Sequence, residues 1–579
     1  MKFKALAFCG LLLASAVYAT DPVVGPQIRT DTNGGTAAAN ETSAASVDPL
    51  GNEIVGTYND WRASGSQEII RMGVSVSNDG GLSWTDFLVR PPAQNQSGVE
   101  GDPMTAYDQR TGTLWVGAIS FAGNGGIFVA RKNPGQNTFQ PSVMARASGG
   151  ADKCWMAAGA GPGDPNVTRA YIAYNEGCIR STDMGQTWSS PVTLGTGIGF
   201  NPRVASNGNV YVTYWDLSSG VMFRKSTNGG VSFAAAQRVA TRMDTWSIND
   251  GSRGPGNFRK PPMNAIAVDP NTGAIYIVYF DTTNIVNGNR NLDLYMVKST
   301  DEGAHWTTPR FINADANPPG DQFFPWLEID YKSRLHLTWY DSRNTVQNDT
   351  ATNGMYDNYY SYSDDGGQTW SEARLTPSPW NSNNDGLNRS QQFLGDYNAL
   401  AFGGNRAYPY YLSTQNGDPD IFTNVIIDPD VVPVSFQVVL GNGTGDRTTL
   451  FKSDNNRLIV ENPRAWSVPG DTASVIFDAT APVSTPSSFT YTIESGANPG
   501  YTHTVELWNW NSNAWDVIAT DSTQTTDEVI TRDKTATSAN YIQAGTRAVR
   551  SRSSWSPNGA PAIPKLTVRI DHVVWTVMP

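Results

Sequence analysis

The residues of this chain that could do chemistry gather at the ends of short strands predicted by a repeated sequence pattern. Five of them are not repeated and are therefore the strongest site candidates: Arg62, Glu176, Arg203, Arg343 and Tyr397. A guanidinium group binds a carboxylate through two parallel hydrogen bonds. Arginines beside carboxylates therefore suit a ligand that carries a carboxylate of its own, such as an acidic sugar.

Other charged residues at these strand ends recur from one repeat to the next. Asp60, Asp216, Asp281 and Asp341 each end a strand two residues after a Tyr or Trp. A repeated Asp is typical of a side chain that caps the N–H groups of a loop. The same predicted face receives the starts of the first strands, which contribute Glu100, Asp102, Asp152, Lys153, Arg203, Arg259, Lys260, Asp321, Asp396 and Tyr397.

The element that must position these residues is a small sheet marked by an octet that occurs five times. The octet has the form Ser-x-Asp-x-Gly-x-Thr-Trp, with Asn228, Phe233 and His305 as departures. Its Asp can cap backbone N–H groups and its Gly can take a positive φ, so the octet predicts a hairpin turn. The copies span residues 77–84, 181–188, 226–233, 299–306 and 363–370. These octets resemble the Asp-boxes, or BNR repeats, of the sialidase-like β-propellers.

A strand–turn–strand pattern occurs seven times between residues 45 and 411, and each copy is expected to form one four-stranded blade. The composition agrees with an all-β fold, because 39% hydrophobic and 11% aromatic residues accompany only 16% charged residues, 55 Gly and 35 Pro. The sequence therefore predicts a β-propeller over residues 20–430. Seven blades are favoured, and six, the number typical of sialidases, are the alternative.

The resemblance to sialidases implies roles for individual residues. Sialidases bind the substrate carboxylate with three arginines, use a Tyr nucleophile activated by a Glu and protonate the leaving group with an Asp. Asp60 would be the acid, because no Asp lies between Arg62 and the first octet. The residues that the resemblance implies are Tyr397, Glu176 and Asp60 for catalysis, and Arg62, Arg203 and Arg343 for substrate binding.

The N-terminus and the net charge bound the compartment and the partners. Residues 1–19 combine Lys2 and Lys4, an apolar run and a small-residue site ending at Ala19, which predicts a signal peptide and a secreted or periplasmic protein. The net charge is −12, and it becomes −14 once Lys2 and Lys4 are removed. A chain this acidic repels nucleic acid and anionic lipid. We therefore expect no nucleic-acid partner and no membrane insertion. We also expect a monomer.

Two cysteines remain after the predicted signal is removed, Cys154 and Cys178. An even pair in an oxidising compartment predicts a disulfide, which would close a loop of about 25 residues and stabilise the fold by about 3 kcal/mol. Two buried free thiols are the alternative.

The last part of the chain, residues 431–579, carries no octet and alternates as strands do. A β-sandwich accessory domain is expected there. Trp508, Trp510 and Trp515 could stack on sugars, and the alternative is that they pack against neighbouring strands. No zinc, haem, nucleotide or flavin motif is present, so no cofactor is expected. A structural Ca²⁺ could take oxygens from Asp281, Asn287, Asn289 and Asp293.

These features predict a secreted glycoside hydrolase of sialidase-like architecture that acts on glycans, including glycans with acidic sugars. A non-catalytic propeller that binds glycans or proteins is the first alternative. A polysaccharide lyase is the second, although the chain has only four His to supply the base that such a reaction needs.

Overall fold

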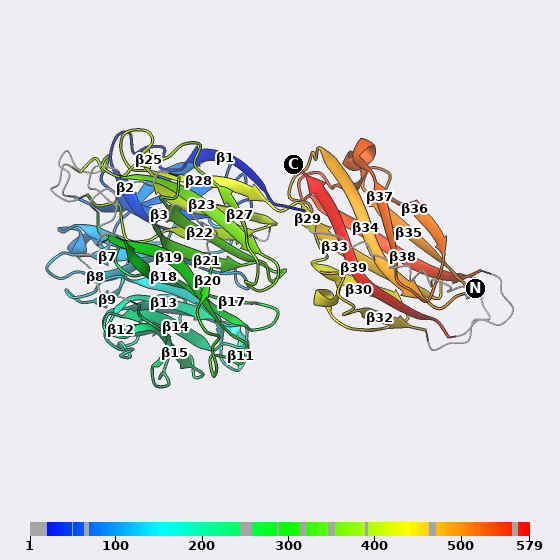
Figure 1. Cartoon of the computed structure of the whole chain (residues 1–579), viewed down its shortest axis with the longest axis horizontal. Coiled ribbons are helices and arrows are strands. Elements are labelled where there is room, and N and C mark those ends of the chain that lie inside the picture. The colour runs from blue at the N-terminus through cyan, green and yellow to red at the C-terminus, as the bar shows by residue number, and fades with distance from the viewer. Residues whose placement is uncertain are drawn as a thin grey trace, which may run out of the picture. The chain divides into compact units, whose positions relative to one another are not determined.

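The computed structural model describes residues 20–48, 50–62, 69–243, 258–286, 289–312, 320–344, 354–387, 392–462, 470–558 and 565–579. The predicted signal and Asn287 lie outside these residues. The chain divides into two compact units, Val24–Ile427 and Asp428–Pro579, and residues 20–23 belong to the second. Strands make up nearly all of the regular structure in both units (Figure 1). No helix among the described residues is long and apolar enough to cross a membrane.

The first unit contains seven small antiparallel sheets within its described residues, and each sheet is one blade of a propeller. Blade 1 comprises β2 (Ala39–Ser46), β3 (Ile54–Asp60), β4 (Arg71–Ser77) and β5 (Thr85–Val89). The short 3₁₀ helix Ala93–Asn95 leads to blade 2, which comprises β6 (Glu100–Asp108), β7 (Thr113–Ser120), β8 (Gly126–Lys132) and β9 (Val143–Ala147). Blade 3 comprises β10 (Trp155–Gly161), β11 (Asp164–Tyr174) and β12 (Gly177–Ser181).

The next three blades repeat this order. Blade 4 comprises β13 (Ile198–Val204), β14 (Val210–Asp216), β15 (Gly220–Ser226) and β16 (Gln237–Thr241). Blade 5 comprises β17 (Asn264–Val268), β18 (Ile275–Val286), β19 (Asn289–Ser299) and β20 (Arg310–Phe311). Blade 6 comprises β21 (Gln322–Ile329), β22 (Leu335–Asp341), β23 (Met355–Ser363) and β24 (Ser371–Arg374), with β25 (Trp380–Asn381) also paired to β23.

The seventh blade closes the ring with a strand from the other end of the propeller. Its strands are β26 (Ala399–Gly403), β27 (Arg406–Ser413) and β28 (Asp420–Ile427), and β1 (Val23–Arg29) pairs with β28 as its outermost strand. The first strands of successive blades contact one another in order, from β2 through β6, β10, β13, β17 and β21 to β26, and β26 contacts β2. The favoured count of seven blades is therefore confirmed.

The repeated octets are the hairpin turns that lead into the outermost strand of a blade, as the sequence predicts. In the fifth octet Asp365 accepts hydrogen bonds from the backbone N of Gln368 at 2.7 Å and of Thr369 at 2.9 Å, and from the Thr369 hydroxyl at 2.6 Å. Gly366 and Gly367 have φ values of 70° and 84°. Blade 7 lacks an octet because its outermost strand, β1, does not follow β28 in the chain.

The octet of blade 4 shows that Asn can replace Asp in this turn. Asn228 accepts from the backbone N of Ser232 at 3.0 Å and donates to the Ser232 hydroxyl at 2.9 Å. We therefore expect Asp365→Asn to leave stability nearly unchanged, and Asp365→Ala to lower the free energy of unfolding of the propeller by about 1–2 kcal/mol through lost capping bonds. Denaturant titration of both variants is the measurement, and equal loss in the two would contradict the capping role.

The second unit is a sandwich of two sheets, each with five strands in its main order. One sheet has the order β31 (Asn442–Thr444), β32 (Leu458–Glu461), β39 (Thr567–Met578), β34 (Ser488–Ala497) and β37 (Glu528–Asp533), and β29 (Asp430–Val431) also pairs with β39. The other has the order β30 (Ser435–Leu440), β33 (Ala473–Thr480), β38 (Ala548–Pro557), β35 (Tyr501–Asn509) and β36 (Ala514–Ser522). The connections hold two 3₁₀ helices, Arg447–Leu450 and Thr535–Thr537, and the helical turn α1 (Ser538–Tyr541).

The three tryptophans proposed as a sugar platform lie together on the sandwich. Trp508 of β35 is directly opposite Trp515 of β36, and their rings meet at 73° with centroids 5.1 Å apart. Trp510 contacts Trp508 at 81°. The guanidinium of Arg552 lies 4.5 Å from the centre of the Trp515 ring. The arrangement is a cross-strand aromatic pair, and a sugar-stacking role stays a prediction.

The predicted disulfide is not formed, because the two cysteines point to opposite faces of blade 3. Cys178 is opposite Ala173, and Ala173 is opposite Trp155, so Cys178 shares a face with Trp155. Cys154 precedes Trp155 by one residue and therefore points the other way. Both thiols are buried and free. Strand β11 also separates them, by two strand spacings of roughly 4.8 Å each, which exceeds the reach of a disulfide.

Candidate active site at the channel mouth

The first strands of several blades are irregular at the end of the central channel opposite the Asp-box turns. The β2–β3, β6–β7 and β21–β22 pairings each shift register after the second residue of the first strand. The bulged residues Glu41, Asp102 and Phe324 have φ values of 53°, 52° and 51°, and Lys153, just before β10, has 53°. Non-glycine residues rarely adopt this conformation, and such strain is concentrated at functional sites.

Charged side chains from five blades meet beside these bulges. The Nζ atom of Lys153 lies 3.4 Å from Glu41 Oε1 and 3.2 Å from Asp102 Oδ1, and it also forms an ion pair with Asp396. Arg259 approaches Asp396 from blade 5, with Nε 2.8 Å from Oδ1 and Nη2 2.5 Å from Oδ2. We refer to Glu41, Asp102, Lys153, Arg259 and Asp396 as the channel-mouth cluster.

Burial and neighbouring charges shift the pKa values of two carboxyl groups of this cluster in opposite directions. Burial raises the pKa of Glu41 to about 8, against the opposing effect of Lys153. Burial also favours the neutral form of Asp396, but Lys153 and Arg259 outweigh it and hold the pKa of Asp396 below its usual value. Although burial opposes its charge, the carboxylates around Lys153 raise the pKa of its ammonium well above the usual value. At neutral pH the cluster therefore holds one carboxylic acid beside a carboxylate, the division of states that acid–base catalysis uses.

Tyr397, which the sequence analysis proposes as a site residue, lies beside the cluster. Its ring meets Trp155 edge to face at 5.0 Å, and Lys153 Nζ is 5.9 Å from the ring centre. The hydroxyl is buried and has no hydrogen-bond partner among the described residues. Burial, reinforced by the negative charge of Glu41, raises the pKa of the phenol well above its usual value. An unpaired buried hydroxyl is costly, so Tyr397 is a candidate donor to a bound ligand.

Glu176 does not meet Tyr397 in the structure. It follows β11 in blade 3, where it forms a hydrogen bond with the Ser148 hydroxyl and accepts one from Tyr174 at 3.3 Å. Arg146 of β9 lies 3.5 Å from its carboxylate. The carboxyl groups that act on the pKa of Tyr397 are those of Glu41, Asp102 and Asp396. Glu41, rather than Glu176, is therefore the glutamate whose charge acts on Tyr397.

Arg62 binds carboxylates of its own blade and is not part of the channel-mouth cluster. Its Nε donates to Asp60 Oδ2 at 2.6 Å, its backbone N donates to Asp60 Oδ1 at 2.8 Å, and Asp86 of β5 completes its ion pairs. Asp60, predicted as the acid, is thus the partner of Arg62, and burial raises its pKa from the usual value.

Arg343 repeats this arrangement in blade 6. Its backbone N and Nε donate to Asp341 at 2.7 and 2.8 Å, and Nη1 donates to Glu372 of β24 at 2.7 Å. In both blades an Asp-x-Arg turn directs the guanidinium toward the outermost strand. The repeated aspartates Asp60, Asp216 and Asp341 cap backbone N–H groups, as their repetition predicts.

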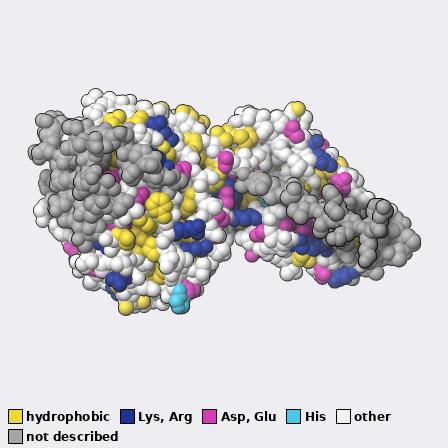
Figure 2. Space-filling view, in the orientation of Figure 1, with side chains coloured by type: hydrophobic (Ala, Val, Ile, Leu, Met, Phe, Trp, Pro, Cys, Tyr) yellow, Lys and Arg dark blue, Asp and Glu magenta, His cyan; other side chains and the backbone are white. Residues whose placement is uncertain are grey.

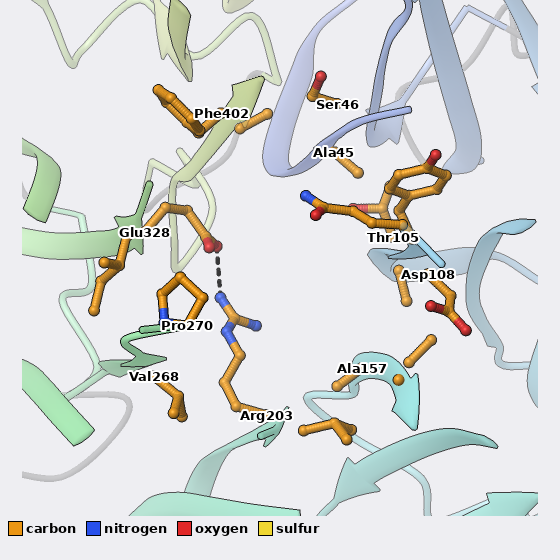
Figure 3. A pocket seen from close by; sticks show the side chains of 18 of the residues that line it. Ala45, Ser46, Thr105, Asp108, Ala157, Arg203, Val268, Pro270, Glu328 and Phe402 are labelled. Atoms are coloured by element: carbon orange, nitrogen blue, oxygen red, sulfur yellow. Dashed lines mark hydrogen bonds and ion pairs between the residues drawn. The ribbon is translucent and has the colours of Figure 1, made fainter. Parts of the chain in front are cut away.

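Arg203 lies at the other end of the channel, and its predicted place beside Arg62 and Arg343 is wrong. Strand β13 starts at Ile198, so Arg203 is one residue from its end rather than at its start. There it donates to Glu328 Oε1 at 2.6 Å, and both residues line a cavity of about 440 Å³ (Figure 3). The Trp326 ring lies 5.5 Å from its guanidinium. The three predicted arginines therefore do not form one carboxylate-binding pocket.

Other residues that the sequence analysis places on this face also have partners in the structure. Lys260 is buried and forms an ion pair with Asp321 at 3.2 Å between blades 5 and 6. Asp281 and Asp293, two of the four proposed Ca²⁺ ligands, are opposite each other in β18 and β19, and Asp281 accepts from the backbone N of Met243 at 2.8 Å. Elsewhere on the surface, the described part of the face in Figure 2 shows basic and acidic side chains interspersed rather than one basic patch.

Comparison with known protein families identifies the repeat. The BNR/Asp-box repeat family matches residues 361–372, which cover the fifth octet and its turn. The chain is a β-propeller that carries a BNR/Asp-box repeat. No curated protein sequence matches it.

Several solved structures resemble this Asp-box propeller at low identity. A protein of unknown function from Dyadobacter fermentans has 13% identity and a TM-score of 0.37, with 72% of this chain and 100% of that chain covered. Trypanosoma rangeli sialidase has 11% identity and a TM-score of 0.36, with 93% and 92% covered. The GH93 α-L-arabinofuranosidase of Fusarium graminearum has 11% identity and a TM-score of 0.35, with 71% and 98% covered.

Glu41 is the one member of the cluster that the sequence analysis of the propeller does not select. The repeat alignment starts the first strand at Ala45, whereas β2 starts at Ala39. Aligning the blades on the bulge instead would place Glu41-Thr42 beside Asp102-Pro103. That shared register is the signal that could have identified Glu41.

Proposed function

We propose that this propeller is a glycoside hydrolase whose reaction takes place at the channel-mouth cluster. The observation that carries the proposal is the pair of carboxyl groups, Glu41 and Asp396, held by one ammonium group, Lys153 Nζ. Glycoside hydrolysis needs one carboxylic acid to protonate the leaving oxygen and one carboxylate to stabilise or attack the sugar cation.

The chemical states and the spacing assign the two roles. Glu41, whose pKa is about 8, is protonated at neutral pH and can donate to the glycosidic oxygen. Asp396, whose pKa is lowered, is ionised and can act on the anomeric carbon. Because both groups contact the same Nζ atom, the contacting oxygens are closer than the roughly 6.5–9.5 Å separation of inverting enzymes. The arrangement supports retention of anomeric configuration.

The charge of the site favours a neutral sugar as the substrate. Once Glu41 is protonated, the carboxylates of Asp102 and Asp396 balance Lys153 and Arg259. No cation of the cluster is left to hold a substrate carboxylate, and Arg62 and Arg343 bind their own carboxylates in separate blades. We therefore propose neutral glycans in place of the acidic sugars that the sequence suggests. Export by residues 1–19 stays a prediction.

A non-catalytic binding propeller is the second candidate, and the burial of the cluster favours it. Glu41, Asp102, Lys153 and Asp396 are each less than 7% exposed, and Arg259 is the most accessible member, with 28% of its side chain exposed. Ion pairs so enclosed could serve to join four blades.

A hydrolysis screen of the purified chain separates these functions. We expect release of sugar from neutral aryl glycosides or neutral polysaccharides, with the retained anomer formed first as observed by NMR. Sialosides and uronic-acid polymers are the comparison substrates. Cleavage confined to sialosides would contradict the neutral-sugar assignment, an unsaturated product would indicate a lyase, and binding without cleavage of any substrate would favour the non-catalytic propeller.

A further inference from the structure

Three acidic side chains converge on one sheet of the C-terminal sandwich. They are Glu494 of β34, Asp571 of β39 and Asp527, which directly precedes β37, and one oxygen of each lies within 4.8 Å of the others. Strands β39, β34 and β37 are neighbours in this sheet (Figure 1). We propose that Glu494, Asp527 and Asp571 form a binding site for a hard divalent cation, with Ca²⁺ as the best fit.

An irregularity in the sheet places the central ligand. The β34–β39 ladder pairs Glu494 with His572 and then Ser495 with Ile570, so Asp571 is the extra residue of a β-bulge. A bulge re-aims a side chain that the regular alternation would direct elsewhere. Asp571 is only 1% exposed, although it carries a carboxylate. The sequence thus keeps an ionisable group inside the sheet at a position where an apolar residue would be the ordinary choice.

Each of the three carboxylates has one buried oxygen without a hydrogen-bond partner in the part of the chain that the structure describes. Glu494 Oε2, Asp527 Oδ1 and Asp571 Oδ1 are all buried and accept no hydrogen bond. The other oxygen of Asp571 accepts from the backbone N of Asn455 at 3.0 Å. Buried carboxylate oxygens without donors are destabilising, because they have lost water and gained nothing in exchange. A cation held between the three would satisfy all of them at once.

The surroundings leave the trio with an excess of negative charge. Arg457 forms an ion pair with Asp527 and is the one cation that pairs with any of the three carboxylates among the described residues. Arg569 also lies nearby, since a Cβ atom at Gly496 would lie 2.8 Å from Asp527 Oδ1, 3.0 Å from the Thr526 carbonyl oxygen and 3.1 Å from Arg569 Nη2. A carboxylate and a carbonyl are thus brought to the same side of β34 by the lack of a side chain.

The donor set selects the kind of ion. All three ligands are carboxylate oxygens, which suit hard cations, whereas zinc sites in proteins are usually built with His or Cys. Ca²⁺ accepts irregular coordination by six to eight oxygens at 2.3–2.6 Å, and water can complete its shell. Mg²⁺ demands a near-octahedral set at shorter distances, which three converging carboxylates from separate strands do not offer.

Cation binding by the full-length, EDTA-treated protein tests the site. We expect calorimetry to show one bound Ca²⁺ and the unfolding temperature of the sandwich to rise by about 5–10 °C when Ca²⁺ is a hundred times its Kd. Mg²⁺ and Zn²⁺ should give smaller shifts. No Ca²⁺ binding at millimolar concentration by the folded protein would overturn the proposal.

Matched variants locate the binding. Asp571→Asn and Asp527→Asn should each reduce the affinity for Ca²⁺ at least tenfold, whereas Glu528→Gln, one residue beyond Asp527 and outside the trio, should retain it. If Asp571→Asn does not fold, Glu494→Gln serves in its place. Unchanged Ca²⁺ affinity in the trio variants, or equal loss in Glu528→Gln, would show that any bound ion lies elsewhere and would overturn the assignment.

Discussion

Glu41→Gln is expected to lower kcat/KM toward the cleaved glycan by about 10²–10⁴-fold, because it removes the proton that assists departure of the leaving group. Glutamine has nearly the same shape and can still accept the hydrogen bond that Asn59 donates to Glu41 at 2.7 Å. The unfolding temperature should therefore change little. Initial rates and thermal unfolding, measured on the same preparation, separate the loss of the proton from a loss of structure.

The pH profile gives this prediction a second readout. A group with a pKa of about 8 is protonated below that pH and loses its proton above it, so kcat/KM of the wild type should fall as pH rises through about 8. In Glu41→Gln the residual rate should lack this alkaline decline. The control is Glu100→Gln, because Glu100 is also buried in a first strand but pairs with Arg90 at 2.8 Å, outside the cluster. An equal loss of activity in Glu100→Gln would contradict a catalytic role for Glu41.

Tyr397→Phe distinguishes the nucleophile implied by the sialidase resemblance from a ligand-binding hydroxyl. If the phenol attacks the sugar, its removal abolishes turnover as completely as the loss of Asp396 would. If it only donates a hydrogen bond to substrate, a smaller loss of roughly 10-fold is expected, spread over KM and kcat. Its raised pKa, together with the proposed action of Asp396 on the anomeric carbon, favours the second result.

Features fixed by local interactions could be predicted from the sequence. Each Asp-box closes its turn with hydrogen bonds over at most four residues, as Asp365 shows with Thr369, so eight letters suffice to identify it. The strand–turn–strand pattern likewise predicts the blades, because each pair is adjacent in the chain. The strand that completes blade 7 could not be found this way, since β1 and β28 are separated by nearly four hundred residues.

The site was harder to predict because it depends on where each strand starts and which way its side chains point. A shift of a few residues moved Arg203 from one end of the channel to the other. Cys154, the residue before β10, points away from Cys178 because successive side chains of an extended chain point to opposite faces. Arg62 and Arg343 each bind an aspartate of their own blade through an Asp-x-Arg turn. Their positions in the sequence do not distinguish this arrangement from a shared pocket. The bulges that bring Glu41, Asp102 and Lys153 together are not marked by any particular residue type in the sequence.

Lys153→Met is expected to lower the free energy of unfolding of the propeller at neutral pH by about 3–5 kcal/mol, because it leaves buried carboxylates without their cation. Methionine has a similar length, so the loss measures charge more than volume. Asp102 would keep no cationic partner in the cluster, and Asp396 would keep only Arg259. Denaturant titration of the propeller transition is the measurement. Lys225→Met is the control, since Lys225 pairs with a single Glu302 whose side chain is 48% exposed, and it should cost less than about 1 kcal/mol.

The pH dependence of this loss distinguishes charge from packing. Without Lys153 the folded-state pKa of Asp396, which Lys153 helps to hold below its usual value, should rise, so the folded variant takes up a proton at higher pH than the wild type and recovers stability as pH falls. The deficit of Lys153→Met should therefore shrink between pH 7 and pH 5. Adding Asp102→Asn should restore part of the stability at neutral pH, because two neighbours in one ion-pair network are not additive. A deficit that is constant with pH and unaffected by Asp102→Asn would show that Lys153 acts through its methylene chain, and the cluster would then not be held together by its charges.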